Sequence, residues 1–389
     1  MGSDPFVYSF FLIFVCSGVL ATIALYTRQP LIITYIVTGM LLGPSGFAFI
    51  DNPQLISSIA KFGIIFLLFL LGLDMQPSKL LNTLKSSLTV GIGSSLIFLS
   101  IGFAIAALFA YTLTETLIIG IAMMFSSTII GIKLLPTTVL HHRRTGELII
   151  SLLLIQDLIA IIVLLVITGG FLEFTGASKV ALVLINLPLL IGGAWLFVKY
   201  VLLKLLEKFD AFHEYIFLIA IAWCLGLAEI SEFAGLSMEI GAFVAGITIA
   251  TSPISLYIAD HLKPLRDFFL VLFFFSIGAG FNMDMLAEVA VPAIVMAAAM
   301  LALKPVVFRF LLRRMSENRE LGWETGFRLG QISEFSLLIA FIATAEHLIS
   351  QEASHLIQAT AILTFLISSY IVVFRYPTPI AANDKLRRD

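Results

Sequence analysis

Residues Leu148 to Thr168 form an almost unbroken apolar run, LIISLLLIQDLIAIIVLLVIT, which has Gln156 and Asp157 near its centre. At about 1.5 Å of rise per residue, a helix of this length crosses the roughly 30 Å hydrocarbon core of a bilayer. Asp157 would then lie close to the membrane midplane, where a charged side chain costs about 2.5 to 3.5 kcal/mol on translocon scales. A carboxylate at this depth is expected to face a packed interior or a watery cavity, so it marks an ion or proton path.

The composition extends this interpretation to the whole chain. Hydrophobic residues make up 60% of the sequence and charged residues only 12%, which excludes a water-soluble globular domain and a disordered chain. Both cysteines, Cys16 and Cys224, lie inside apolar runs, and the sequence contains no disulfide framework or cluster with metal-ligand spacing. The sequence therefore predicts an all-α polytopic membrane protein without a resident cofactor.

Apolar windows between polar, Gly and Pro breaks predict thirteen transmembrane helices. They cover residues 6–26, 31–43, 60–73, 87–110, 115–139, 145–169, 179–203, 212–232, 237–250, 264–281, 287–312, 321–346 and 353–375. All but three of the 23 Lys and Arg residues follow odd-numbered spans, the exceptions being Lys61, Lys179 and Lys304. Basic residues collect in cytoplasmic loops, so this pattern predicts an N-terminus outside and a C-terminus in the cytoplasm.

An internal repeat is indicated at an offset of about 206 residues. Leu31 to Gly43 (LIITYIVTGMLLG) aligns with Ser237 to Ile249 (SMEIGAFVAGITI), and the segments ending at Gly72 and Gly278 also correspond. Each half would contain six spans with the seventh between them, which gives the two halves inverted topology. Inverted repeats recur among secondary transporters.

Polar residues interrupt two spans at equivalent positions of the repeat. Span 5 carries Ser126, Ser127 and Thr128, and span 12 carries Gln331, Ser333 and Glu334. An unwound segment inside each of two paired helices exposes backbone carbonyls near the midplane, where a small ion can bind. The alternative interpretation is that each hydroxyl bonds within its own helix. The coincidence of the two positions favours crossed discontinuous helices.

Three further side chains belong to the predicted site. Gln156 is expected to offer its amide oxygen to a cation or a donor to Asp157. Lys304 is the basic residue placed well inside a span, and it is expected to pair with Asp157 or to compete with the cation. Glu334 is expected to tether the broken helix or to bind a counter-charge. One titrating acid suits the exchange of one proton for one monovalent cation, because Ca²⁺ and Mg²⁺ sites usually recruit more carboxylates.

Several stretches resemble the Kef-type potassium efflux branch of the monovalent cation:proton antiporters. They are LLIQDLIAI, SSTIIGIKLLP, GLSMEIGAFVAGITIATSP, LKPLRDFFLVLFFFSIGAGFNMDML and GFRLGQISEFSLLIA. The resemblance runs from about residue 10 to 375 with the motifs in order, and it implies a sodium/proton antiporter-like fold. Gln156 and Asp157 match the family's Gln-Asp pair, and Lys304 matches its membrane-embedded lysine. The clusters Ser126, Ser127, Thr128 and Gln331, Glu334 match its two unwound segments.

The resemblance also implies a division of labour within a homodimer. Residues 1–86 and 206–286 would form the dimerisation scaffold, residues 87–170 and 287–375 the ion-transporting core, and residues 179–205 the linker helix. Kef systems continue into a cytoplasmic nucleotide-binding domain. The tail, residues 376–389, is therefore interpreted either as the start of such a domain in a longer parent chain or as the end of an ungated relative.

The hypothesis at this stage is K⁺/H⁺ exchange in a bacterial inner membrane, with both ions competing for Asp157 and the core moving by alternating access. Lipid and a second copy of the chain are the expected partners, and nucleic acid is not. The alternatives are Na⁺/H⁺ exchange on the same fold, a cation channel and a sodium-coupled symporter. An enzyme is not expected, because the loops between spans are short and no nucleophile-base motif is evident.

Overall fold

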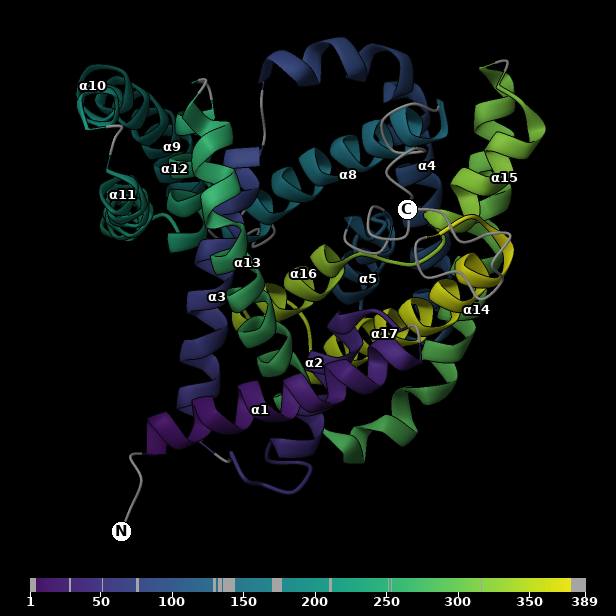
Figure 1. Ribbon diagram of the computed structural model, residues 1–389. Coiled ribbons are helices and arrows are strands. Elements are labelled where there is room, and N and C mark those ends of the chain that lie inside the picture. The colour runs from purple at the N-terminus through teal and green to yellow at the C-terminus, as the bar shows by residue number, and fades with distance from the viewer. Residues whose placement is uncertain are drawn as a thin grey trace. The chain divides into compact units, whose positions relative to one another are not determined.

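The computed structural model describes residues 5–378 except 28, 51, 75–76, 129–130, 132–134, 136–143, 170–176, 210–211, 251, 253 and 316. The described residues are predominantly helical (Figure 1). The helices of the first part of the chain are α1 (Pro5–Tyr26), α2 (Leu31–Leu42), α3 (Pro53–Asp74), α4 (Pro77–Leu108), α5 (Leu113–Met123) and α8 (Arg144–Thr168). Those of the middle are α9 (Ala177–Phe197), η1 (Val198–Leu202), α10 (Leu203–Lys208), α11 (His213–Phe233), α12 (Met238–Ala250) and α13 (Ile254–Ala279). The last part contains η2 (Met283–Met285), α14 (Leu286–Arg314), α15 (Arg319–Arg328), α16 (Glu334–Ala345) and α17 (Gln351–Arg375).

Within the described residues, eight helices are long and apolar enough to span a membrane. They are Phe6–Tyr26, Leu55–Leu73, Ser87–Leu108, Arg144–Thr168, Ile185–Lys208, Glu214–Phe233, Met283–Arg314 and Gln351–Arg375. Four shorter apolar helices accompany them: Leu31–Leu42, Leu113–Met123, Met238–Ala250 and Glu334–Ala345. The prediction of an all-helical integral membrane protein is confirmed. The count of thirteen spans and the inverted repeat stay predictions.

Three helices begin well before the apolar windows that predicted them. α3 begins at Pro53, α4 at Pro77 and α13 at Ile254, whereas the windows begin at residues 60, 87 and 264. Hydropathy marks only the part of a helix that suits hydrocarbon, and polar residues continue the helix beyond it. Pro at the first helical position of α3 and α4 is favourable, because that residue needs no amide proton and its φ suits a helix.

The chain divides into two compact units. The first unit contains residues 1–51, 83–162 and 277–389, and the second contains residues 52–82 and 163–276. This division by compactness places residues 1–51 with α14 to α17, whereas the predicted scaffold includes residues 1–86. Compactness does not report which helices move together, so the division into scaffold and core stays a prediction.

In the second unit, α3 and α12 cross at two glycines that let the backbones meet. A Cβ atom added at Gly246 would lie 2.1 Å from Phe69 O, and one added at Gly72 would lie 2.5 Å from Phe243 O. Small residues of this kind allow close helix packing in membranes, where dispersion contacts and weak hydrogen bonds replace the hydrophobic effect between helices. The crossing with α3 therefore explains Gly246, whereas Gly241 of the same helix lies against α11.

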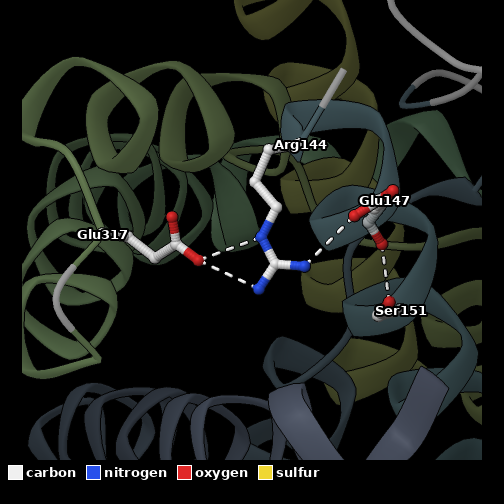
Figure 2. A network of polar contacts seen from close by, with 4 residues as sticks. All are labelled: Arg144, Glu147, Ser151 and Glu317. Carbon is white, nitrogen blue, oxygen red and sulfur yellow. Dashed lines mark hydrogen bonds and ion pairs between the residues drawn. The ribbon is translucent and has the colours of Figure 1, made fainter. Parts of the chain in front are cut away.

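In the first unit, α14 contacts both α15 and α17, and its buried face packs on α4 and α8. The rings of Phe98 and Phe308 meet edge to face at 5.4 Å between centroids. Figure 2 shows a second connection, in which Arg144 at the start of α8 binds Glu317 in the segment between α14 and α15. Two guanidinium nitrogens of Arg144 lie 3.0 Å from one carboxylate oxygen of Glu317, and a third nitrogen lies 3.1 Å from Glu147. Half-exposed ion pairs contribute little to stability, so this network mainly orients the start of α8.

The glycine crossing gives a test of the second unit. Gly246→Val should lower the free energy of unfolding by about 1 to 3 kcal/mol, because α3 and α12 must separate to admit the side chain. Gly226→Val in α11 is the matched control, since, apart from the neighbouring backbone of its own helix, no atom of the described residues lies within 4 Å of its added Cβ. Apparent melting temperatures of the purified protein in detergent measure both effects. Equal melting temperatures for the two variants would contradict the close crossing.

Candidate functional site

The chain leaves the helical conformation at both positions that the polar interruptions predicted. α5 ends at Met123, and residues 125–127 lie outside any helix before helical residue Thr128. α15 ends at Arg328, and residues 329–333 lie outside any helix before α16 begins at Glu334. We call residues 125–127 the first break and residues 329–333 the second break. Both breaks and the helices around them belong to the first unit.

Side chains at the second break form hydrogen bonds with backbone amides at the start of α16. The Ser333 Oγ accepts a hydrogen bond from the Phe335 amide at 3.1 Å, and the Ser336 Oγ accepts one from the Ser333 amide at 3.3 Å. The Ser336 hydroxyl also donates to the Ala122 carbonyl in α5 at 2.5 Å. This reciprocal capping explains why the helix can restart inside a buried region, where unpaired amides are costly. Ser333 is therefore a helix cap in this conformation.

The two breaks are bonded directly to each other. The Ser126 hydroxyl donates to the Leu329 carbonyl at 2.9 Å, and the Thr128 hydroxyl donates to a Glu334 carboxylate oxygen at 2.9 Å. Thr128 and Glu334 are the two residues that the repeat offset of 206 makes equivalent. Glu334 therefore forms a hydrogen bond from the start of α16 to the other broken helix, and its role in transport stays a prediction. Ser127 is fully buried beside them.

Lys304 joins the breaks from α14. Its Nζ donates to the Phe125 carbonyl at 2.6 Å, to the Gln331 carbonyl at 3.0 Å and to the Ser126 Oγ at 3.3 Å. The ring of Phe98 lies 5.1 Å from the same nitrogen. An ammonium has three donors, and these contacts account for all of them. In this conformation the fully buried Lys304 therefore serves the backbone of the breaks, and its pairing with Asp157 stays a prediction.

Gln156 contacts the first break from the middle of α8, and Asp157 is the next residue of that helix. The Gln156 Oε1 accepts the Ser126 amide proton at 2.9 Å, which identifies this atom as the oxygen because only an acceptor fits there. Within the described part of the chain, the Gln156 Nε2 has no hydrogen-bond partner although it is buried. Asp157, the next residue, is 5% exposed. Gln156 therefore holds the first break against the helix that carries the acid.

Gln331 contributes to the site mainly through its backbone. Its side chain accepts a hydrogen bond from the Ser368 hydroxyl of α17 at 2.8 Å and donates to the Arg328 carbonyl at 3.0 Å. The Ile332 amide, next along the chain, donates to the Thr364 Oγ1 of α17 at 3.3 Å. These bonds leave the Gln331 carbonyl directed at Lys304. The second break is thus fixed by α17 as the first is by α8.

Four residues of this arrangement were not expected from the sequence: Thr364, Ser368, Ser336 and Phe98. Ser and Thr within transmembrane helices commonly bond to their own helix, as Thr360 does to the Leu356 carbonyl at 2.8 Å, so their type alone does not single them out. The repeat offset of 206 could have identified Phe98, because it makes Phe98 the equivalent of Lys304 in the first half of the chain. The starts of α8 and α17 are 207 positions apart, and that spacing pairs Thr364 with Asp157.

The residues at and next to the two bonded breaks provide the carboxylates of Glu334 and Asp157, together with backbone carbonyls and hydroxyls. Among the described residues, no group of three His, Cys, Asp or Glu side chains could hold a metal ion. Calcium and magnesium sites usually recruit more carboxylates, so this set of oxygens suits a small monovalent cation better. A proton can replace such a cation on a carboxylate.

A buried carboxylate within a long apolar helix, together with two helix breaks that are bonded to each other, is typical of secondary ion transporters. Comparison with known proteins gives the family. The chain matches the transmembrane sodium/hydrogen exchanger family over residues 10–374 and belongs to it. Its relatives place it with the membrane domains of Kef-type cation:proton antiporters.

Two relatives and one solved structure illustrate the match. K(+) efflux antiporter 4 of Arabidopsis thaliana is 28% identical over 361 residues, which cover 90% of this chain and 60% of that protein. The iron transporter MagA of Paramagnetospirillum magneticum is 26% identical over 358 residues, which cover 91% and 81%. The structure of the sodium proton antiporter MjNhaP1 from Methanocaldococcus jannaschii at pH 8 shares the fold with a TM-score of 0.69 at 17% identity, over 94% of this chain and 95% of that one. The chain spans about 60% of the length of the Arabidopsis antiporters that it matches.

The contacts of Lys304 predict that it stabilises the breaks. Lys304→Met removes the donors of the Phe125 and Gln331 carbonyls, and each buried acceptor left unpaired costs about 1 to 3 kcal/mol. The apparent melting temperature should therefore fall by several degrees. Lys199→Met in η1, an exposed lysine that lies 4.7 Å from the ring of Trp195, is the control and should change little. An unchanged or higher melting temperature for Lys304→Met would mean that desolvation of the ammonium outweighs its hydrogen bonds.

Proposed function

We propose that the protein exchanges a monovalent cation, K⁺ in preference to Na⁺, for protons across a bacterial inner membrane. The cation and the proton compete for Asp157, and either one neutralises the carboxylate. Only the neutralised site crosses the membrane barrier, because a bare charge at the bilayer centre is costly. The ion-binding residues are Asp157, Gln156, Ser126, Ser127 and Thr128, and Lys304, Gln331, Ser333 and Glu334 support them. The inference of K⁺ rests on the Gln-Asp pair and on the named activity of the potassium efflux relatives.

The observation that carries this proposal is the position of Asp157. It is buried within a 25-residue apolar helix, and the residue before it is bonded to the first break. A purely structural membrane protein has no evident use for a carboxylate at this depth. Backbone that leaves the helical conformation is tolerated in a membrane only where protein or water surrounds it. The acid and both breaks therefore suit a cation that passes between two aqueous sides.

The lengths and spacing of the helices support an inverted repeat at the predicted offset. α4 covers 32 residues from Pro77, and 32 residues from Met283 to Arg314 lie 206 positions later. α8 and α17 each contain 25 residues and begin 207 positions apart. The caps of α5 and α15, Thr112 and Asn318, are again 206 positions apart. With α9, η1 and α10 between the halves, this pattern favours thirteen spans with inverted halves.

The proposed transport cycle uses the division of labour described for the family. Residues 87–170 and 287–375 move as one core against the scaffold formed by residues 1–86 and 206–286, in an elevator-type alternation. The scaffold mediates a homodimer, the N-terminus lies outside and the C-terminus lies in the cytoplasm. The asymmetric distribution of Lys and Arg over the predicted loops supports this orientation.

Replacing the acid tests the mechanism. Asp157→Asn should abolish cation-dependent proton movement in proteoliposomes while the melting temperature stays within a few degrees of wild type, since Asn is uncharged and similar in size. Asp284→Asn in η2 is the matched control, because Asp284 is exposed and distant from α8 in the sequence. Retained exchange in Asp157→Asn would remove this carboxylate from the mechanism.

The choice of cation is tested by the dissipation of an imposed pH gradient in proteoliposomes. We expect K⁺ and Rb⁺ to dissipate the gradient at lower concentration than Na⁺ and Li⁺, with Fe²⁺ inactive because divalent ions usually recruit more carboxylates than the proposed site offers. Accumulation of ⁸⁶Rb⁺ against its own gradient, driven by the pH difference, separates exchange from a channel. Preference for Na⁺ would replace K⁺/H⁺ by Na⁺/H⁺ exchange. Cation flux without proton movement would favour a channel, and uptake of an organic solute with Na⁺ would favour a symporter.

A further inference from the structure

Two peptide groups in the breaks are held in the same way. In the first, the Phe125 carbonyl accepts from Lys304 and the Ser126 amide donates to Gln156 of α8. In the second, the Gln331 carbonyl accepts from Lys304 and the Ile332 amide donates to Thr364 of α17. The C=O of one residue and the N–H of the next form a single planar unit. Each peptide plane is therefore held at both its carbonyl and its amide. The two residues that provide the carbonyls, Phe125 and Gln331, are 206 positions apart.

The hydrogen bond to Thr364 matters because of this planarity. Holding the amide of a trans peptide fixes the direction of the carbonyl on its opposite edge. An amide that donates a hydrogen bond also polarises its peptide, which makes the carbonyl a better acceptor. The Thr364 Oγ1 is therefore coupled to the Lys304 ammonium through the 331–332 peptide, although the two side chains act on different atoms. Gln156 has the same relation to Lys304 through the 125–126 peptide.

Thr364 accepts a hydrogen bond from the second break, and this bond distinguishes it from Thr360, the other buried threonine of α17. The Thr364 hydroxyl donates to the Ala361 carbonyl at 3.0 Å, which leaves its oxygen able to accept from Ile332. The Thr360 hydroxyl donates to the Leu356 carbonyl in the same manner. Both residues are fully buried in α17 and lie one turn apart. Thr360 therefore shares the burial and the helix bond of Thr364, and it provides a matched control for the bond to the second break.

We infer that Thr364 is a positioning residue for transport, which orients the 331–332 peptide so that both breaks converge on Lys304. This inference rests on the proposed function. In the second half of the chain Thr364 occupies the place that Asp157 has in the first, 207 positions earlier, because α8 and α17 begin at that spacing. Thr364 performs for the second break the holding role that Gln156 performs for the first. The Thr364 hydroxyl fixes a peptide without adding a further charge to those of Asp157, Glu334 and Lys304.

The test compares Thr364→Val, Thr364→Ser and Thr360→Val in proteoliposomes. Valine keeps the shape of threonine and removes the acceptor of the Ile332 amide. The maximal exchange rate at saturating K⁺ should fall about fivefold in Thr364→Val, as expected for one lost buried hydrogen bond. The K⁺ concentration for half-maximal rate should change less than twofold, because Thr364 is not among the proposed cation ligands. Thr364→Ser, which keeps the hydroxyl, should restore most of the rate, and Thr360→Val should match wild type.

A double-mutant cycle separates positioning from general loss of packing. If Thr364 acts through the hydrogen bond between Lys304 and the Gln331 carbonyl, Thr364→Val should have a smaller effect when Lys304 is absent. It should lower the melting temperature by at most half as much in a Lys304→Met background as in wild type. Additive effects in this cycle, or equal rates for Thr364→Val and Thr360→Val, would overturn the inference. If Lys304→Met does not fold, the comparison of the three threonine variants decides alone. A wild-type protein without any exchange would overturn the proposed function, and the melting-temperature cycle would still decide whether Thr364 acts through Lys304.

Discussion

The buried ammonium of Lys304 is the interaction on which the candidate site depends. A helix that breaks inside a membrane frees carbonyl and amide groups, and each one left unpaired in an apolar setting costs several kcal/mol. Lys304 places one cation where a carbonyl from each break is directed, at 2.6 and 3.0 Å. A desolvated ammonium without partners also costs free energy. The hydrogen bonds between Lys304 and the two carbonyls therefore lower the cost of burying both the charge and the unpaired backbone groups.

The two halves of the site differ in one chemically decisive residue. α8 supplies Gln156 and Asp157, and the spacing of 207 between the starts of α8 and α17 pairs Asp157 with Thr364 in the proposed repeat. A second carboxylate in that place would repel the first, and one of the two would stay protonated. The Thr364 hydroxyl avoids that coupling. In the proposed function Asp157 therefore carries the exchangeable charge, while the Glu334 carboxylate is bonded to Thr128.

The sequence predicted the location of the breaks better than their bonding. Ser126, Ser127, Thr128 and Gln331 stand out because polar residues are rare within apolar runs, and the spacing of 206 between Thr128 and Glu334 pairs the two segments. The partner of the Lys304 Nζ could not be predicted, because its acceptors are backbone carbonyls, which every residue possesses. Thr364 and Thr360 have the same residue type, burial and helix, and only the position of the Ile332 amide distinguishes them. The predicted starts of α3, α4 and α13 were too late, because hydropathy marks the residues that suit hydrocarbon and not the full length of the helical backbone.

The bonding pattern also bears on how the site would move. Asp157 is adjacent to Gln156, whose oxygen holds the 125–126 peptide, and this peptide is joined through Lys304 to the 331–332 peptide and Thr364. A motion that carried α8 alone past the breaks would have to exchange the hydrogen bond between Ser126 and Gln156. A motion that separated the breaks from α14 or α17 would have to exchange the other three, each worth about 0.5 to 1.5 kcal/mol net and more if left unmade. A motion that carries α8, both breaks, α14 and α17 together retains all of them. These hydrogen bonds therefore suit the displacement of the whole core that we propose, because that motion keeps them intact.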